Sequence, residues 1–346
     1  GQGPALDVQL AEGGLSHPFL LVIAAAGLDL LVGDPRWCLH PVVVMGACIR
    51  WLRRGVETLC GDRPWRLRLG GVWITLVLVL GSGGCGWALE RLVLPGAPLP
   101  LPWAAAVLVV ALASALAARS LHDSVLQVLA ALPDLVAARQ ALGWIVGRDT
   151  AALNRQEILR AAAETASENA VDGLFAPLFW MLVGAGLWQL GWTSAPGPLA
   201  LAWAFKASST LDSMLGYRRG RLQWLGSAGA RLDDGLTWLP CRLVLLSLPL
   251  VCRPWRAWLR LVRAAERDGR PDPSPNAGRS QAIYAHCAGV RLGGANRYGE
   301  RWVEKPLLAS DQAEVSEPAV QRILQLNLRL ELLWLLPALL ISAAQR

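Results

Sequence analysis

The sequence contains little charge and almost no lysine. Only 17% of its 346 residues are charged and 54% are hydrophobic, and lysine occurs only at Lys206 and Lys305. A soluble globular protein usually carries about a quarter of its residues as charged side chains. The chain also lacks any basic run interleaved with aromatic residues on which bases could stack. We therefore expect a membrane protein that does not bind nucleic acid.

The cysteines show no pattern that predicts a metal site or a disulfide framework. The seven cysteines include neither a CxxC pair nor a cysteine–histidine spacing typical of zinc, and their number is odd. The first residues, GQGPALDVQL, lack the basic start of a cleavable signal. We expect free thiols and no cleavable signal.

Long apolar segments predict an all-α, polytopic membrane protein. A helix needs about 20 mostly apolar residues to cross a bilayer, and the 17 tryptophans fit the preference of indole for the membrane boundary. Segment 198–217 is left open because it contains Lys206 and Asp212, and 236–252 because it contains two prolines and an arginine. We expect one membrane-embedded domain over 1–346, with spans near 19–33, 69–89, 102–118, 174–192 and 328–342.

The arginines predict the orientation of the chain. They gather in loops, and the positive-inside rule places 34–68, 119–173 and 253–325 in the cytoplasm. If both open segments crossed the membrane, the arginine-rich stretch 253–270 would lie outside. One of the two must therefore be re-entrant or interfacial.

The stretch ETASENAVDGLFAP spaces three acids four residues apart. In an α-helix, Glu164, Glu168 and Asp172 would share one face and repel one another unless a cation or a basic partner lay opposite. Oxygen ligands suit Mg²⁺. The row is therefore a candidate site for a metal or a cationic group, and the alternative is a solvated helix face.

Three further stretches combine charge with turn-forming residues. GDPRWCLHP places Asp34 and His40 at the end of a span, as ligands or as a cap and turn. Lys206 and Asp212 lie in an apolar run, where an ionisable residue marks a site or a pair by default. In RLGGANRYG, glycines flanked by arginines could admit an anion to the backbone, or form a surface loop.

Together the four stretches closely resemble one family. The patterns GDPxxxxHPVxxMG, ExxxENxxDGxxxPLF, K…LDSMxGYxxxR…GxxxARLDD and PSPNAG…GVRLGGxNRYG occur in that order from about Asp29 to Gly299. They resemble the CobD/CbiB family, the adenosylcobinamide-phosphate synthases of cobalamin biosynthesis.

The resemblance implies an ATP-dependent ligase in a bacterial cytoplasmic (inner) membrane. It would join a carboxylate of adenosylcobyric acid to (R)-1-aminopropan-2-ol or its O-phosphate, through an acyl phosphate, with ATP and Mg²⁺ required and the active site on the cytoplasmic side. The oligomeric state stays open, a homo-oligomer included. The alternatives are a transporter, a non-catalytic scaffold of the corrinoid pathway, and an enzyme that carries out phosphoryl transfer.

We assign expected roles to residues within the matching motifs. The expected catalytic residues are Lys206, Glu164, Glu168 and Asp172, and the expected metal ligands are Glu164, Glu168, Asp233 and Asp234. The residues expected to bind substrate or ATP are Asp34, His40, Asn169, Asp212, Arg218, Arg231, Asn276, Arg291, Gly293, Gly294, Asn296 and Arg297.

Overall fold

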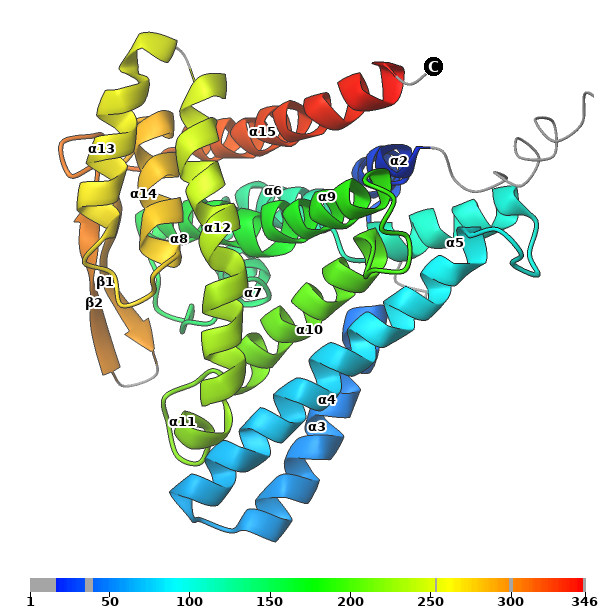
Figure 1. Ribbon diagram of the computed structural model, residues 1–346. Helices are drawn as coiled ribbons and strands as arrows, with labels where there is room; N and C mark the ends of the chain where they lie inside the picture. Colours follow the sequence, from blue (N-terminus) through cyan, green and yellow to red (C-terminus); the bar gives the residue numbers. More distant parts are fainter. Residues whose placement is uncertain (1–16, 35–39, 253, 299–300, 345–346) are drawn as a thin grey trace, which may run out of the picture. The chain divides into compact units, whose positions relative to one another are not determined.

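The structure is a computed structural model that describes residues 17–34, 40–252, 254–298 and 301–344. Its contacts group the chain into two compact units (Figure 1). Unit 1 comprises 1–116, 177–233 and 336–346, and unit 2 comprises 117–176 and 234–335. Residues 35–39 of the first motif, Cys38 included, and Gly299 of the last lie outside the described residues. The single domain expected from the sequence stays a prediction, because grouped contacts do not say whether the units fold separately.

Helices make up unit 1. They are α2 (Pro18–Val32), α3 (Pro41–Cys60), α4 (Pro64–Glu90), α5 (Leu101–Ala113), most of α9 (Ala176–Gln189), α10 (Pro198–Leu215), α11 (Leu222–Leu225), the first turns of α12 (Ser227–Val251) and the end of α15 (Glu317–Ala344), with a 3₁₀ turn at Arg91–Val93. Proline stands in the first turn of α2, α3, α4 and α10, where its fixed φ suits a helix start and its missing N–H is not needed.

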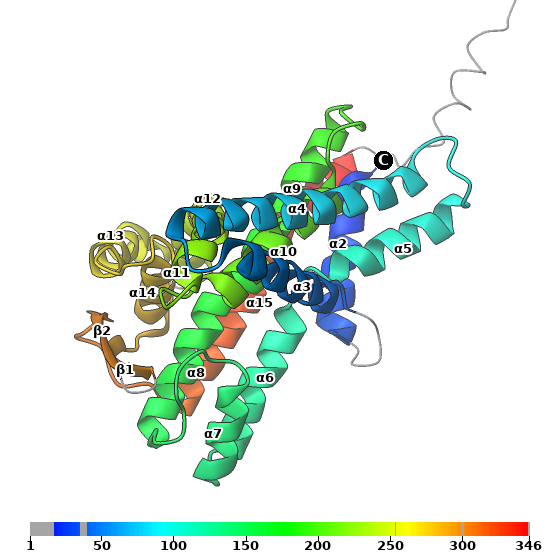
Figure 2. The same cartoon turned by 90° about the horizontal axis from the view of Figure 1, so that it is seen from below.

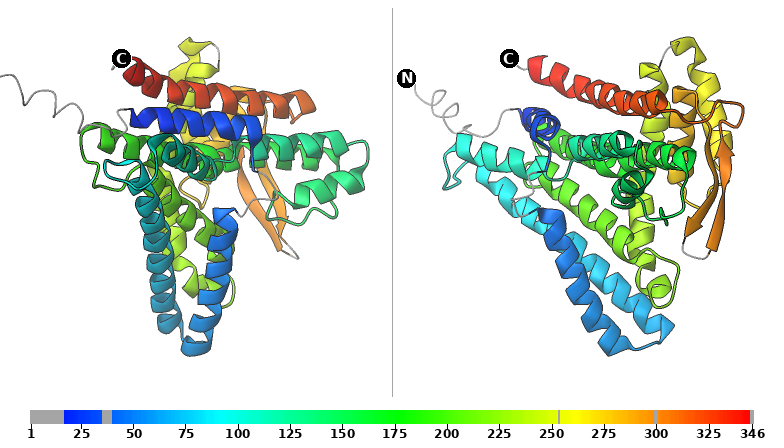
Figure 3. Two further views of the ribbon diagram at one scale, coloured as in Figure 1. Left: turned by 90° about the vertical axis from the view of Figure 1, so that its right-hand side faces the viewer. Right: turned by 180° about the vertical axis from the view of Figure 1, so that it is seen from behind.

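Helix α4 is the centre of unit 1. It packs along α3, α10 and α11, and Figure 3 shows α3 and α4 as an antiparallel pair. A side chain at Gly71 would place its Cβ 2.0 Å from the backbone oxygen of Leu225, so glycine is needed for this close approach. At its other end, buried Glu90 accepts hydrogen bonds from the N–H groups of Gly197, Leu199 and Ala200. This carboxylate satisfies the otherwise unpaired amides at the start of α10.

Unit 2 contains helices and one small sheet. The helices are α6 (Ala118–Ala131), α7 (Leu135–Gly143), α8 (Arg155–Ala170), α13 (Trp258–Gly269), α14 (Ala277–Ala288), the rest of α12 and most of α15, with a π-helical turn at Val171–Phe175 and a 3₁₀ turn at Trp255–Ala257. Asn154 and Glu157 form a capping box at the start of α8. Figure 2 shows α13 and α14 side by side.

The sheet is an antiparallel hairpin of β1 (Leu292–Tyr298) and β2 (Arg301–Leu308). The sequence left this stretch open between an anion-binding backbone and a surface loop. Instead, the stretch pairs as strands, with an irregular register between Leu292 and Gly294. Gly293 and Gly294 have φ of 83° and 91°, which glycine alone adopts readily, so they form the irregular step in the strand. The glycines that favoured a loop instead allow a kinked strand.

The predicted fold class is confirmed. Apart from this hairpin the described elements are helical, and five helices are long and apolar enough to cross a membrane: Pro64–Val93, Leu101–Ala131, Arg155–Gln189, Ser227–Val251 and Glu317–Ala344. Helix α2 is apolar but shorter. Of the two segments left open, 236–252 overlaps a candidate span, whereas α10 is not among the candidates of this length and hydropathy.

Candidate functional site

Glu164 of α8 is held by basic and N–H donors on both of its oxygens. Arg148 donates to Oε2, and the backbone N–H of Gly293 donates to Oε1 at 3.0 Å. The Nε atom of Arg160 lies 3.9 Å from Oε1. The side chains of Arg148 and Glu164 are only 7% and 6% exposed. The acid row therefore has a basic partner, which was one of the two ways in which its repulsion could be relieved.

The same two arginines bind strand β1. Arg160 donates to the backbone oxygens of Gly293 at 2.8 Å and Ala295 at 2.9 Å. Both Arg148 and Arg160 donate to the side-chain oxygen of Asn296, which is buried. A Cβ at Gly293 would lie 2.0 Å from the backbone oxygen of Pro306. The second and fourth motifs therefore meet in one network, which we call the Glu164 network: Arg148, Arg160, Glu164, Gly293 and Asn296.

Glu168 lies one helical turn further along α8 and has different surroundings. The amide of Gln281 on α14 donates to its Oε2 at 2.5 Å. The positive charge of Lys305 and the negative charges of Glu164 and Asp272 act on it. Lys305 stands opposite Gly294 in the hairpin. Glu168 therefore lies among groups of both signs.

The acid row does not continue as a regular α-helix. Helix α8 ends at Ala170, and Asp172 lies in the π-helical turn. Because a π-turn is wider, Asp172 is displaced around the axis from the position that an α-helix would give it. Single π-turns occur often at functional sites. Asn169 is in the last turn of α8 and is partly exposed.

The PSPNAG turn is fixed to helix α12. The side chain of Asn276 donates to the backbone oxygen of Asp234 at 2.9 Å and accepts from Arg242 at 2.5 Å. Arg279 donates twice to Glu266, and this hydrogen bonding lowers the pKa of the Glu266 carboxyl. Asn276 thus places this turn beside Asp234, a predicted metal ligand.

A polar cavity of about 340 Å³ adjoins the Glu164 network. Arg160 and Gly293 line it, together with Arg291, which also pairs with Glu314. Gly294 adjoins the guanidinium of Arg160. Arg297 lies on β1 opposite Trp302, by its backbone.

The predicted site residues of unit 1 lie on or beside α3, α10 and α12. His40 caps α3 by accepting from the N–H of Val42, and its other ring nitrogen lies 3.2 Å from Asp34. His40 therefore caps α3, and its role in binding substrate or ATP stays a prediction. Lys206 and Asp212 are on α10, where the backbone oxygen of Asp212 accepts from Gly216. The remaining predicted residues are Arg218 and Arg231, both exposed, and Asp233.

Within the described residues, no three histidine, cysteine, aspartate or glutamate side chains are grouped so that they could hold a metal ion. Magnesium binding at Glu164, Glu168, Asp233 and Asp234 stays a prediction. The free cysteines agree with the absence of a disulfide framework in the described part of the chain.

Four residues of unit 2 were not predicted as site residues: Arg148, Arg160, Gln281 and Lys305. Arg160 precedes Glu164 by four residues, a spacing that favours a helical ion pair. That signal was available in the sequence. Arg148, Gln281 and Lys305 are distant along the chain, and only the fold brings them to the acids.

Comparisons with known proteins identify close relatives. A family model described as "CobD/Cbib protein" matches residues 22–327. A "Cobalamin biosynthesis protein CobD" from Synechocystis sp. is 41% identical over 84% of this chain and 83% of its own length. A protein of the same name from Geobacter metallireducens is 41% identical over 83% and 85%. The "Cobalamin biosynthesis protein CbiB" of Salmonella typhimurium is 38% identical over 86% and 89%. No solved structure matches the chain.

Proposed function

We propose that this chain, which belongs to the CobD/CbiB family, is the ATP-dependent ligase that joins adenosylcobyric acid to (R)-1-aminopropan-2-ol or its O-phosphate. Family membership supports a role in cobalamin biosynthesis. The reaction, its nucleotide and its cytoplasmic orientation in the bacterial inner membrane are the proposal.

The chemistry requires an activated carboxylate. A carboxylate oxygen of the corrinoid attacks the γ-phosphorus of ATP, the bond to the bridging oxygen breaks, and ADP leaves. The neutral amine then attacks the acyl carbon, the carbon–oxygen bond breaks, and phosphate leaves while the amine nitrogen loses a proton. These steps need cationic groups that hold phosphate oxygens and an acceptor for the proton.

The observation that carries the proposal is the Glu164 network. It contains one buried ion pair, Arg148–Glu164, and joins the acid motif of α8 to the glycine-rich strand β1 through hydrogen bonds. Arg160 and Arg291 border a cavity beside Gly293. Guanidinium groups bind phosphate oxygens, and two acidic residues, Glu157 and Glu314, also line the cavity. We assign the phosphates of ATP to this cavity.

The residues of the acid row divide between two roles. Both oxygens of Glu164 are taken up by Arg148 and Gly293, so Glu164 orients the phosphate cavity. Glu168 holds the amine or a Mg²⁺ ion, because its one described hydrogen bond leaves it further acceptor capacity.

Magnesium fits this donor set only if phosphate and water complete its ligands. Mg²⁺ commonly takes one or two carboxylates and keeps several waters, and Glu168 with Asp234, both in unit 2, would hold it. When bound, it would neutralise charge on the phosphates. Lys206 belongs to unit 1, and we propose it as a fixed positive charge that turnover requires.

The decisive test is ADP release by the purified full chain. We expect release that requires both the corrinoid acid and the amine, together with Mg²⁺. Arg160→Gln should lower it by at least tenfold, whereas Arg260→Gln, a matched loss of charge at an exposed position of α13, should not. ADP release that is independent of the amine would contradict a ligase.

A transporter or a scaffold would give a different result in the same assay. A scaffold would release no ADP under any condition. A transporter coupled to ATP would release ADP without forming the amide. Detecting the amide product by mass spectrometry alongside ADP therefore separates all three functions.

A further inference from the structure

Unit 2 contains a pair of cysteines that the proposed ligase reaction does not use. Cys252 directly follows the end of α12, and Cys287 lies in the last turn of α14. The thiol of Cys252 donates to the backbone oxygen of Cys287 at 3.1 Å. The two thiols also form a hydrogen bond with each other. The fold therefore brings together two sulfur atoms that are 35 residues apart in the chain.

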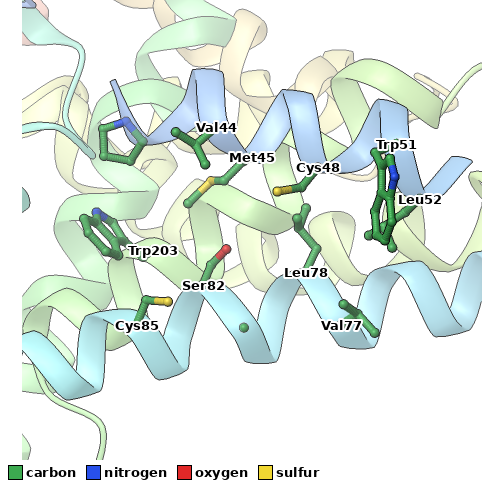
Figure 4. Close-up of a pocket in the computed structure, with 12 residues that line it drawn as sticks. Val44, Met45, Cys48, Trp51, Leu52, Val77, Leu78, Ser82, Cys85 and Trp203 are labelled. Atoms are coloured by element: carbon green, nitrogen blue, oxygen red, sulfur yellow. The ribbon is translucent and has the colours of Figure 1, made fainter. Parts of the chain in front are cut away.

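The other described cysteines have different surroundings. Cys48 of α3 and Cys85 of α4 line an apolar groove of about 450 Å³ in unit 1, and Figure 4 shows them on opposite helices. Cys60 and Cys241 each donate to the backbone oxygen of a residue that is not a cysteine. Within the described residues, the pair in unit 2 is therefore the only one in which two thiols are hydrogen-bonded to each other.

The surroundings of the two thiols make them chemically different. The hydrogen bond from Cys287 lowers the pKa of Cys252 to about 7; burial opposes this shift, and the positive charge of Arg329 on α15 favours it. About half of Cys252 is therefore a thiolate at pH 7, compared with about 3% of a thiol whose pKa is the usual 8.5 or so. The hydrogen bond to Cys252, together with burial, raises the pKa of Cys287. Cys252 is thus the thiolate that can attack, while Cys287 keeps its proton.

Both cysteines are partly exposed, so a small reagent can reach them. Cys287 belongs to the segment 253–325, for which the positive-inside rule predicts a cytoplasmic location. The cytoplasm keeps protein thiols reduced, and disulfides that form there are usually transient and serve redox sensing or catalysis. A reactive pair of thiols in this segment is therefore suited to reversible oxidation and not to a permanent structural disulfide.

We propose that Cys252 and Cys287 form a thiol–disulfide exchange site that reacts with small-molecule disulfides of the glutathione type. The Cys252 thiolate attacks one sulfur of the small disulfide, a mixed disulfide forms, and one small thiolate leaves. The hydrogen bond that held the proton on Cys287 is then lost. Cys287 gives its proton to solvent and attacks the sulfur of Cys252, and the second small thiolate leaves. The two protein thiols are thereby oxidised to one disulfide, and the small disulfide is reduced to two thiols.

The new disulfide joins the end of α12 to the end of α14. It closes a loop of the chain that contains α13 and the PSPNAG turn. A link of this kind restricts the unfolded chain, so the oxidised protein should be more stable than the reduced one. The site is independent of the ligase reaction, so either proposal stands if the other fails.

Peptide mass spectrometry of the full chain in detergent tests the site. The reduced protein is incubated with glutathione disulfide, and N-ethylmaleimide then blocks the thiols that remain. We expect a peptide linked through Cys252 and Cys287, which dithiothreitol returns to two thiols. A linked peptide that formed no more readily than one between Cys48 and Cys85 would overturn the proposal, because it would reflect unspecific oxidation.

Single substitutions separate the thiol that attacks from the thiol that resolves the mixed disulfide. In Cys287→Ala, the mixed disulfide of Cys252 with glutathione should persist. In the unsubstituted chain it should not accumulate, because a thiol held beside the reacting sulfur reacts far faster than a thiol in solution. Cys252→Ala should trap no glutathione at Cys287. Glutathione trapped in Cys252→Ala and not in Cys287→Ala would contradict the assigned roles.

Thermal unfolding of the unsubstituted chain provides a measurement that does not depend on the folding of a variant. Oxidation should raise the midpoint of unfolding by a few degrees, because the disulfide restricts the unfolded chain. Cys252→Ala is the control, and oxidation should leave its midpoint unchanged. An unchanged midpoint of fully linked, unsubstituted protein would show that the link does not form within the native unit 2, and it would also overturn the proposal.

Discussion

Arg148 and Glu164 form an ion pair in which both side chains are almost completely buried, at 7% and 6% exposure. They are 16 residues apart in the chain. Removing one partner of such a pair leaves an uncompensated charge in the interior and destabilises strongly. This pair therefore makes Glu164 a structural centre of unit 2 as well as a member of the proposed site.

Arg148→Gln and Glu164→Gln should each lower the free energy of unfolding by about 3 to 5 kcal/mol. The double variant should lose much less than the sum, because neither charge is then left alone. Thermal unfolding of the four proteins in detergent measures the cycle, with Glu304→Gln on the exposed surface of β2 as control. Additive losses would mean that the two side chains do not interact.

Glu168→Gln should abolish ADP release and leave the protein stable. The amide oxygen that replaces the carboxylate can still accept from Gln281, so the local packing is retained. Only the charge needed for Mg²⁺ or the amine is lost. ADP release measured across a magnesium titration, with the midpoint of thermal unfolding as control, checks this. Normal turnover would leave Glu168 with a structural role only.

Lys206→Arg should lose most of the turnover although it keeps the positive charge. Lys206 is one of only two lysines in a chain that otherwise uses arginine, and a compact ammonium acts as a point charge where a planar guanidinium does not fit. Lys206→Ala should lose at least as much. Steady-state kinetics of the two variants, with expression level as control, measures these losses. Near-normal turnover of Lys206→Arg would contradict the proposed role of Lys206.

Glu90→Ala should destabilise unit 1 by at least about 2 kcal/mol, because three backbone N–H groups at the start of α10 lose a buried acceptor. Glu90→Gln should cost less, since one oxygen remains. The comparison is Asp123→Ala, which breaks an exposed pair with Arg119 and should cost about 0 to 1 kcal/mol. Thermal unfolding in detergent gives all three values, and equal effects of Glu90→Ala and Asp123→Ala would contradict the capping role.

Alkylation of Cys252 should depend on pH around neutrality. A hydrogen bond from Cys287 stabilises the thiolate and lowers the pKa of Cys252 to about 7, against the opposing effect of burial. Because the thiolate is the reactive form, its rate with iodoacetamide should rise with pH up to and through about 7 and level off above it. Cys287→Ala removes the thiol donor and should move the inflection to higher pH. An inflection unchanged by this substitution would show that Cys287 does not set the pKa.

The sequence by itself determined the class of the fold. Scarce charge and long apolar runs indicate segments that lie within a bilayer. There the backbone N–H and C=O groups must form hydrogen bonds with one another, and an α-helix does this within a single segment. The apolar segments 69–89 and 328–342 therefore lie within α4 and α15. Local rules also held at helix starts, where proline or a cap residue begins α3, α4 and α8. The four motifs identified the family.

The partners of the motif residues depended on tertiary structure. The row of Glu164 and Glu168 was visible as a spacing, but Arg148, Gln281 and Lys305 come from other elements, and no periodicity relates them to the acids. Glu164 and Glu168 have different surroundings because these partners differ.

The β-hairpin shows the same limit. Glycine predicts conformational freedom and says nothing about strand pairing. The stretch forms strand β1 because β2 pairs with it and because Arg160 and Glu164 bind its backbone. A strand is stabilised by the residues that lie opposite it on the neighbouring strand. A local pattern cannot contain that information, so the fold decided how the glycine-rich motif is used.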